Sequence, residues 1–231
     1  MSAGIAFRVY DLYGRFYDGF EMLFKRRLAR ALAAVPFHPG DRVLDIGTGT
    51  GLALEYFPPD VHVTGLDLSM GMLRQAQRKL DAGLVRGECP RSETQLVQGD
   101  ALNLPFGEKA FDVVLLSHVI TTVPDPQRCL AEAIRVVREH GLVVMVNHFR
   151  TPYPVLNWVE SAIDPVCRKL GWRSDLSMME LLGQAGVENM EQAREAPGVL
   201  FRILYLQKKG EGVRVVSLPA PVEREAKFGA A

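Results

Sequence analysis

The sequence has few cysteines, no net charge and no long apolar run, and each absence excludes a class of protein. Its three cysteines, Cys89, Cys129 and Cys167, are odd in number and widely spaced. They predict neither a zinc site nor a disulfide framework, and they indicate a reducing compartment. The 27 basic side chains balance the 27 acidic ones, which argues against a nucleic-acid-binding protein. We therefore expect no metal and no nucleic-acid partner.

The sequence also predicts neither a membrane-spanning segment nor a signal peptide. No stretch approaches the roughly 20 consecutive apolar residues that span a bilayer. Arg8 and Asp11 stand where a signal peptide would carry its apolar run, so we expect no secretion signal. The sequence predicts a cytoplasmic protein that meets a membrane, if at all, at its surface.

What the sequence does contain is a glycine loop at the end of an apolar strand, in the segment Val43–Gly51. Glycine loops of this kind usually receive a phosphate. Here Leu52 occupies the position of the third glycine in the dinucleotide-binding pattern. A carboxylate at Asp45, just before the glycines, would repel a phosphate and attract a cation. The loop therefore predicts a nucleoside ligand that carries positive charge, and S-adenosylmethionine (SAM) is the obvious candidate.

Two more acids follow neighbouring strands. Asp67 ends an apolar strand, and Asp100 comes just after the next one. Because the carboxyl ends of such strands meet at the ligand crevice of an open sheet, Asp67 can bind both ribose hydroxyls. Alternatively, Asp67 caps a helix, although Ser69 already suits that role, and Asp100 is a solvated turn residue. Three acids at three successive strand ends favour a binding site.

Apolar runs that alternate with helical patterns predict an α/β fold, a parallel sheet with helices on both faces. The run Phe111–Leu116 is apolar except for Asp112, as expected of a central strand buried on both faces. Ser69 caps one helix, and Gly141 is expected to end another. The expected strands are 43–46, 61–66, 95–97, 111–116 and 142–146, and the expected helices are 69–80 and about 125–139.

The last third of the chain changes character. We expect helices at 153–170 and 176–184. Two late strands, Val187–Gln192 and Val199–Leu206, flank the turn signal Ala196-Pro197-Gly198 and would add an antiparallel hairpin to the sheet edge. The sheet would then be mostly parallel and seven-stranded. The main domain is expected at 36–208, followed by a weakly ordered tail at 209–231.

Residues 1–35 form a distinct segment with an aromatic stripe. Tyr10, Tyr13, Tyr17, Phe20 and Phe24 step by three and four, so one helix face is aromatic. Such a helix either packs over the cofactor as a lid or lies on an anionic membrane surface. Tyr17 is the residue expected to reach the active site, with its hydroxyl towards the acceptor or its ring towards a sulfonium. The basic side chains of this segment are Arg8, Arg15, Lys25, Arg26, Arg27 and Arg30.

Polar side chains at two further strand ends are candidates for the acceptor site. Ser117 and His118 follow the fourth expected strand, and Asn147 and His148 follow the fifth. We expect these strands to be neighbours, so that both pairs open onto one crevice. A histidine there could accept the proton that an amine loses on methylation. A lone histidine is usually structural or exposed, whereas two at adjacent strand ends fit a structural and a functional role about equally. Alignment of the reacting atoms can by itself supply much of the acceleration.

The loop resembles motif I of the class I SAM-dependent methyltransferases, and the span from Tyr13 to about Leu206 is most similar to the Rhodobacter-type bacterial phosphatidylethanolamine N-methyltransferases. The resemblance implies a Rossmann-like fold and successive methylation of the ethanolamine head group towards phosphatidylcholine. It implies SAM as donor, S-adenosylhomocysteine as product, and peripheral association with the anionic inner face of the cytoplasmic membrane. Many lipid-methylating relatives carry Glu in place of Asp45, which keeps the charge. The resemblance rests on Val43 to Gly51, Tyr17-Asp18, Val63–Ser69 with Met72-Leu73-Arg74, Val123–Pro126, and above all Val146–Phe149 and Arg168–Trp172.

The resemblance also implies a role for each strand-end residue. Asp100 would accept a hydrogen bond from the adenine amino group, and the backbone N–H of Ala101 would meet the ring. Met72 either covers an adenine face or belongs to the core. The implied SAM-binding residues are Asp45, Gly47, Thr48, Gly49, Gly51, Asp67, Leu68, Met72, Asp100, Ala101 and Ser117. The implied acceptor-site residues are Tyr17, His118 and His148.

Two other functions fit the same motifs. Quinone C-methyltransferases share the early motifs and the Tyr-Asp pair, so a quinone or small-molecule C- or O-methyltransferase is an alternative. A non-catalytic SAM-binding protein is a second alternative, against which the intact acids and the two strand-end histidines speak. A nucleic-acid methyltransferase is disfavoured, since no Asn/Asp-Pro-Pro-Tyr segment follows the fourth strand.

Overall fold

The computed structural model describes residues 17–83, 94–150, 173, 175–190, 201–210 and 212–218, with the side chains of residues 17–24 and 201 excepted. The strands are β1 Arg42–Ile46, β2 His62–Asp67, β3 Thr94–Gln98, β4 Phe111–Ser117, β5 Val137–His148, β6 Val187–Glu188, β7 Phe201–Lys209 and β8 Gly212–Val216. The helices are α2 Tyr17–Ala33, the 3₁₀ turn η1 Leu52–Tyr56, α3 Met70–Asp81, α4 Pro126–Val136 and α6 Met178–Gln184.

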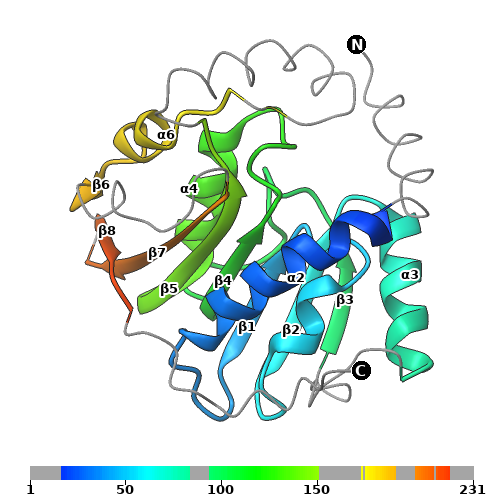
Figure 1. Cartoon of the computed structure of the whole chain (residues 1–231). Helices are drawn as coiled ribbons and strands as arrows, with labels where there is room; N and C mark the ends of the chain where they lie inside the picture. The colour runs from blue at the N-terminus through cyan, green and yellow to red at the C-terminus, as the bar shows by residue number, and fades with distance from the viewer. Residues whose placement is uncertain are drawn as a thin grey trace.

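Eight strands form one mixed sheet in the order β3-β2-β1-β4-β5-β7-β8-β6 (Figure 1). The five strands from β3 to β5 run parallel, whereas β7 is antiparallel to both β5 and β8. This arrangement confirms the Rossmann-like α/β class with a mostly parallel sheet and antiparallel strands at its C-terminal end. The sheet has eight strands where the sequence predicted seven.

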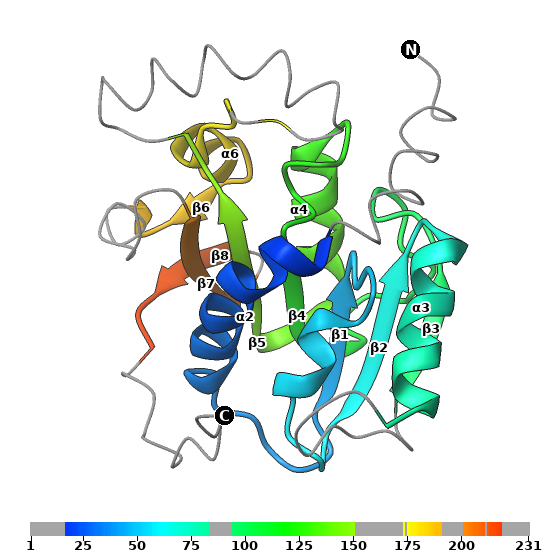
Figure 2. The ribbon, with the colours of Figure 1, turned by 45° about the vertical axis from the view of Figure 1, so that its right-hand side comes forward.

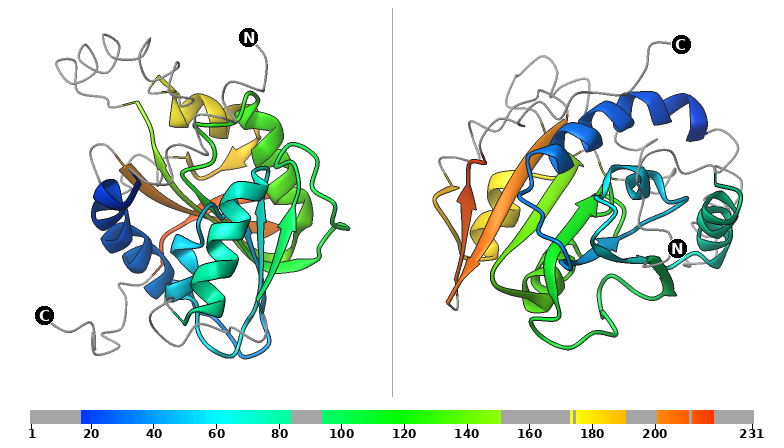
Figure 3. Two further views of the ribbon diagram at one scale, coloured as in Figure 1. Left: turned by 90° about the vertical axis from the view of Figure 1, so that its right-hand side faces the viewer. Right: turned by 90° about the horizontal axis from the view of Figure 1, so that it is seen from below.

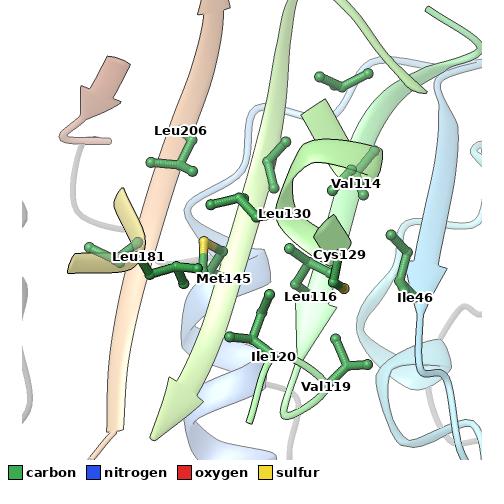
Figure 4. Packing of buried hydrophobic residues seen from close by; sticks show 14 of the residues in the cluster. Ile46, Val114, Leu116, Val119, Ile120, Cys129, Leu130, Met145, Leu181 and Leu206 are labelled. Carbon is green, nitrogen blue, oxygen red and sulfur yellow. The ribbon is translucent and has the colours of Figure 1, made fainter. Parts of the chain in front are cut away.

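Each face of the sheet is covered by its own hydrophobic cluster (Figures 2 and 3). On one face, α2 and η1 pack on β1, β2, β4 and β5 through residues such as Leu28, Leu32 and Leu54. On the other, α4 and α6 pack through Leu130 and Leu181, as Figure 4 shows. Successive residues from Val113 to Leu116 of β4 enter opposite clusters, so this part of the strand is buried on both faces and its sequence is apolar.

Helix starts follow the predicted capping chemistry. The Ser69 hydroxyl accepts a hydrogen bond from the Met72 N–H at 3.3 Å, which places the start of α3 directly after the end of β2. The Asp125 carboxylate caps α4 in the same way, with Pro126 in the first turn. Helix α3 therefore follows closely on Asp67 at the end of β2, which keeps this acid at the edge of the sheet.

The prediction that Gly141 ends a helix is wrong. Helix α4 ends at Val136, and Gly141 lies inside β5. The β4–β5 register shifts between Phe111 and Val113, so β5 bulges, and His140 adopts a φ of 63°. A Cβ at Gly141 would lie 2.6 Å from the carbonyl oxygen of Asp112. The glycine is explained by this close approach of two backbones.

The predicted C-terminal pairing and tail are also corrected. The late hairpin joins β7 to β8, whereas β6 covers only Val187–Glu188 and pairs in parallel with β8. Residues 212–216, expected in a weakly ordered tail, are an ordered strand with Val213 and Val215 in the core. The sheet thus continues beyond residue 208, to Val216.

Several expectations fall outside the described residues. These are the helix at 153–170, the turn signal at 196–198, the segment before residue 17, and the chain after residue 218. Among the helices that the structure describes, none is both long enough and apolar enough to cross a membrane.

Candidate functional site

The glycine loop between β1 and η1 is held against the end of β2 by backbone bonds. The N–H groups of Gly47 and Thr48 donate to the Leu66 carbonyl at 2.7 and 3.0 Å. Gly47, Gly49 and Gly51 all have positive φ, which favours glycine. A Cβ on Gly47 would meet Val119 at 2.8 Å, whereas one on Gly49 would have only the Gly47 carbonyl at 3.9 Å. The open side of the loop is therefore at Gly49, where a ligand can approach the backbone.

Asp45 lies under this loop as a deeply buried acid, with 1% of its surface exposed. Neither carboxylate oxygen makes a hydrogen bond of good geometry to the described residues. Burial raises the pKa of Asp45 to about 7; the Thr48 hydroxyl opposes this shift and the Asp67 carboxylate adds to it. A buried acid that accepts no well-formed hydrogen bond from the described residues, beneath a loop with an open side, fits a cationic ligand, as the sequence predicted.

Asp67 and Asp100 stand at the next two strand ends. One Asp67 oxygen accepts from the Gly49 N–H at 2.9 Å and the other from the Ser69 N–H at 2.8 Å. Burial raises the pKa of Asp67, and the two N–H donors oppose that shift. Asp67 thus links the glycine loop to the start of α3 at the carboxyl end of β2. Asp100 is exposed and accepts from the Leu102 N–H at 2.9 Å.

The residues assigned to the adenine differ in exposure. Leu68 is 59% exposed, and with Met70 it makes up the exposed large hydrophobics in the described part of the chain. An apolar side chain kept in water directly after Asp67 fits an adenine ring that covers it when bound. Met72 and Ala101 are buried, at 6% and 8% exposure. The acidic and apolar side chains at this edge of the sheet therefore fit SAM.

The two histidines come together at the ends of β4 and β5. Ser117 pairs in register with Val146, and the His118 N–H donates to the Val146 carbonyl at 2.9 Å. His118 has a φ of 57°, a costly conformation for a residue with a side chain. Burial lowers the pKa of His118 to about 4, and the charges of Arg27 and His148 lower it further. His118 is therefore neutral at physiological pH, beside a largely buried His148.

Asn147 forms a side-chain hydrogen bond to the backbone of the neighbouring strand β4. Its side-chain N–H donates to the Leu116 carbonyl at 2.9 Å, and the residue is fully buried. By the alternation of β5, Asn147 lies on the face of Met145 while His148 lies on the face of Val146. Only the histidine of this pair is on the α2 side of the sheet.

Arg27 is a candidate site residue that the sequence analysis named only among the basic side chains of the N-terminal segment. The structure brings its charge to His118, and its Nη1 atom is buried. The signal was available, because Arg27 shares a helix face with Ala31, four residues on, and Ala31 is fully buried. The side chain of Tyr17, the other predicted acceptor residue of α2, lies outside the described residues.

Comparisons with known proteins agree with this geometry. A family model described as a methyltransferase domain matches residues 44–145. The chain is 38% identical over 170 residues to a phosphatidylethanolamine N-methyltransferase of Cereibacter sphaeroides, covering 74% of this chain and 81% of that protein. It is 35% identical over 142 residues to a demethylmenaquinone methyltransferase of Thermobifida fusca, covering 61% of this chain and 53% of that protein.

Solved structures show the same fold at lower identity. The YcgJ protein of Bacillus subtilis has a TM-score of 0.59 and 23% identity, covering 74% of this chain and 68% of that one. A Thermotoga maritima protein described as a SAM-dependent methyltransferase, possibly a histamine N-methyltransferase, has a TM-score of 0.58 and 22% identity. That match covers 90% of this chain and 95% of the other.

Proposed function

Because the chain belongs to the class I SAM-dependent methyltransferases, we propose that it methylates the amine of phosphatidylethanolamine, and then its mono- and dimethyl forms, towards phosphatidylcholine. The observation that carries this proposal is the 38% identity that extends over 81% of the Cereibacter phosphatidylethanolamine N-methyltransferase. A match of that length includes the regions outside the common donor-binding motifs.

On the donor side, the chain holds SAM at the ends of β1, β2 and β3. Asp45 and the loop at Gly47–Gly51 would receive the methionine part, Asp67 the ribose, and Asp100 with Ala101 the adenine. When bound, SAM supplies a methyl group on a positively charged sulfur. The carboxylate of Asp45, which has no good hydrogen-bond partner among the described residues, would regain a counter-charge.

On the acceptor side, His118 and His148 would line the pocket with Tyr17. Since the pKa of His118 lies at about 4, its imidazole carries no charge that would repel a cationic donor or an ammonium group. A neutral imidazole can accept a hydrogen bond from the amine and pass its proton to water. His118 and His148 would then act by orienting the amine lone pair towards the methyl group.

We further propose that the outer face of α2 binds the anionic inner face of the cytoplasmic membrane. Arg26 and Arg30 lie four residues apart on α2, and both are exposed. Basic side chains beside such a surface attract anionic lipid. This association would bring the crevice under α2 to the plane of the lipid head groups.

The test is methyl transfer from labelled SAM by the purified protein. Vesicles that contain phosphatidylethanolamine and an anionic lipid are offered in one arm, and demethylmenaquinol in neutral detergent in the other. We expect label in mono-, di- and trimethylated lipid and none in the quinol. Labelled quinol with unlabelled lipid, while SAM still binds, would overturn the lipid assignment.

A second candidate function is quinone C-methylation. The observation in its favour is the 35% identity to the Thermobifida demethylmenaquinone methyltransferase, over 53% of that protein. Quinone methylation predicts transfer to a ring carbon that does not depend on vesicles. The same assay therefore separates the two candidates.

A further inference from the structure

The position of α2 across the strand ends is fixed by contacts at both edges of the helix. Leu28, Ala31 and Leu32 are almost completely buried. The Tyr205 hydroxyl of β7 donates to the Ala31 carbonyl at 3.0 Å. Lys25 forms an ion pair with Glu55 of η1 at 3.5 Å. Arg27 lies between these attachments, so its guanidinium is carried on a docked part of the helix.

Two observations place the Arg27 guanidinium on the sheet side of α2, towards the carboxyl end of β4. Its Nη1 atom is buried. Its charge also acts on the imidazole of His118, at the carboxyl end of β4. Arg26 and Arg30, on the same helix, are exposed. Helix α2 thus has two arginines on its exposed face and one, Arg27, on the side that faces the sheet.

A cation at this position is electrostatically awkward for the proposed reactants. SAM brings a positive sulfonium, and an aminoethyl head group brings a positive ammonium before it loses its proton. A guanidinium beside His118 therefore favours an acceptor that carries an anion as well as the ammonium group. A phosphate diester satisfies this requirement, since it accepts two parallel N–H bonds from arginine.

We propose that Arg27 is a specificity-determining residue that binds the phosphate diester of the phospholipid head group and so positions the amine beside His118 and His148. The inference rests on the proposed phospholipid N-methylation and names the group that selects the acceptor. In phosphatidylethanolamine the phosphate and the amine are joined by a two-carbon link. A fixed phosphate therefore restricts the amine to a short arc in front of the histidines. A neutral amine without phosphate, or a quinol, would lack this anchor.

The experiment measures transfer to phosphatidylethanolamine in mixed micelles of a neutral detergent, where attraction to an anionic surface plays no part. Arg27→Gln removes the charge, and Arg27→Lys keeps it without the bidentate geometry. Arg78→Gln, an exposed arginine on α3, is the matched control. For Arg27→Gln we expect KM for the lipid to rise about tenfold or more. We expect kcat and the Kd for SAM to stay near the wild-type values, and Arg27→Lys to recover part of the loss.

A second readout does not depend on turnover. The water-soluble head group glycerophosphoethanolamine should inhibit the wild-type enzyme competitively with the lipid and should lose most of that inhibition in Arg27→Gln. The pKa of His118, followed by NMR, should rise in Arg27→Gln because a neighbouring cation is gone. A helix that had merely loosened would weaken SAM binding or lower the thermal midpoint as well.

The outcomes separate this inference from the function on which it rests. Transfer to lipid by the wild type with an unchanged KM in Arg27→Gln overturns the phosphate role alone. A fall in kcat at constant KM also overturns it, because a residue that binds the head group should act on KM. Absence of lipid methylation by the wild type overturns the proposed function and this inference with it.

Discussion

Asp45 and His118 show how burial prepares this site for charged ligands. Burial raises the pKa of the acid to about 7 and lowers that of the histidine to about 4. Both shifts favour the neutral form, as expected where water is excluded. At neutral pH His118 is therefore uncharged, and Asp45 is only partly ionised. A bound cation reverses the balance at Asp45, because a nearby positive charge stabilises the carboxylate.

The first prediction is a pH dependence of SAM affinity. SAM binds the ionised form of Asp45, so its binding must displace a proton whenever the pH lies below about 7. Affinity should rise with pH through this range and level off above it, by about tenfold between pH 6 and pH 8. Titration calorimetry at several pH values measures it. Asp45→Asn should bind weakly and lose this slope, and an equal slope in the variant would contradict the role of Asp45.

The second prediction concerns Gly47. Its φ of 73° and the 2.8 Å that would separate an added Cβ from the Val119 side chain make alanine unfavourable there. Gly47→Ala should lower the free energy of unfolding by about 2 kcal/mol and weaken SAM binding. Gly107→Ala is the control, since a Cβ there meets nothing within 4 Å. Equal urea midpoints for the two variants would show that the loop tolerates a side chain.

Among the elements, those set by local chemistry were predictable and those set by pairing were not. Ser69 marks the start of α3 by its capping bond, and the apolar run of β4 marks a central strand. The sequence could not place the end of α4, because Val136 and Val137 continue its apolar pattern while the chain already enters β5. Gly141 looks like a helix stop, but the approach of the Asp112 backbone is what requires it.

The bulge of β5 also positions Arg138, and this gives the third prediction. Arg138 forms ion pairs with Asp112 and, at 3.9 Å, with Asp41, and both acids are buried at the amino ends of the central strands. Arg138→Met should lower the free energy of unfolding by about 1–2 kcal/mol, because half of the arginine side chain is already in water. Urea denaturation measures the loss.

Removing the buried charge of Asp112, which Arg138→Met leaves without its arginine, should restore part of the lost unfolding free energy. The double variant combines Asp112→Asn with Arg138→Met. The Asn side-chain oxygen can still accept the hydrogen bond that the Arg42 N–H donates to Asp112 at 2.7 Å. A double variant no more stable than Arg138→Met alone would show that the buried charge at Asp112 is not the cause.

For the whole molecule, the donor site could be predicted more completely than the acceptor site. Asp45, Asp67 and Asp100 each follow a strand in the sequence, and the parallel order β3-β2-β1 alone brings them to one edge. The acceptor site also depends on where α2 docks, which is a tertiary contact. Sequence patterning grouped Arg27 with Arg26 and Arg30, whereas the docked helix turns Arg27 to His118 and leaves the other two exposed.

The fourth prediction concerns binding to lipid through the two exposed arginines of α2, Arg26 and Arg30. Arg26→Glu with Arg30→Glu should reduce sedimentation with anionic vesicles at low salt, and the wild type should lose binding as salt is raised. The affinity for SAM should not change, because both side chains point away from the strand ends. Undiminished sedimentation of the double variant would contradict α2 as the lipid-facing surface.

The proposed phospholipid methylation is tested most directly by the lipids of a bacterial host that makes phosphatidylethanolamine but no phosphatidylcholine. Mass spectrometry is compared after expression of the wild type and of Asp45→Asn at equal protein levels. We predict mono-, di- and trimethylated phosphatidylethanolamine with the wild type and none with the variant. An unchanged lipid profile from a wild-type protein that binds SAM would contradict phospholipid N-methylation.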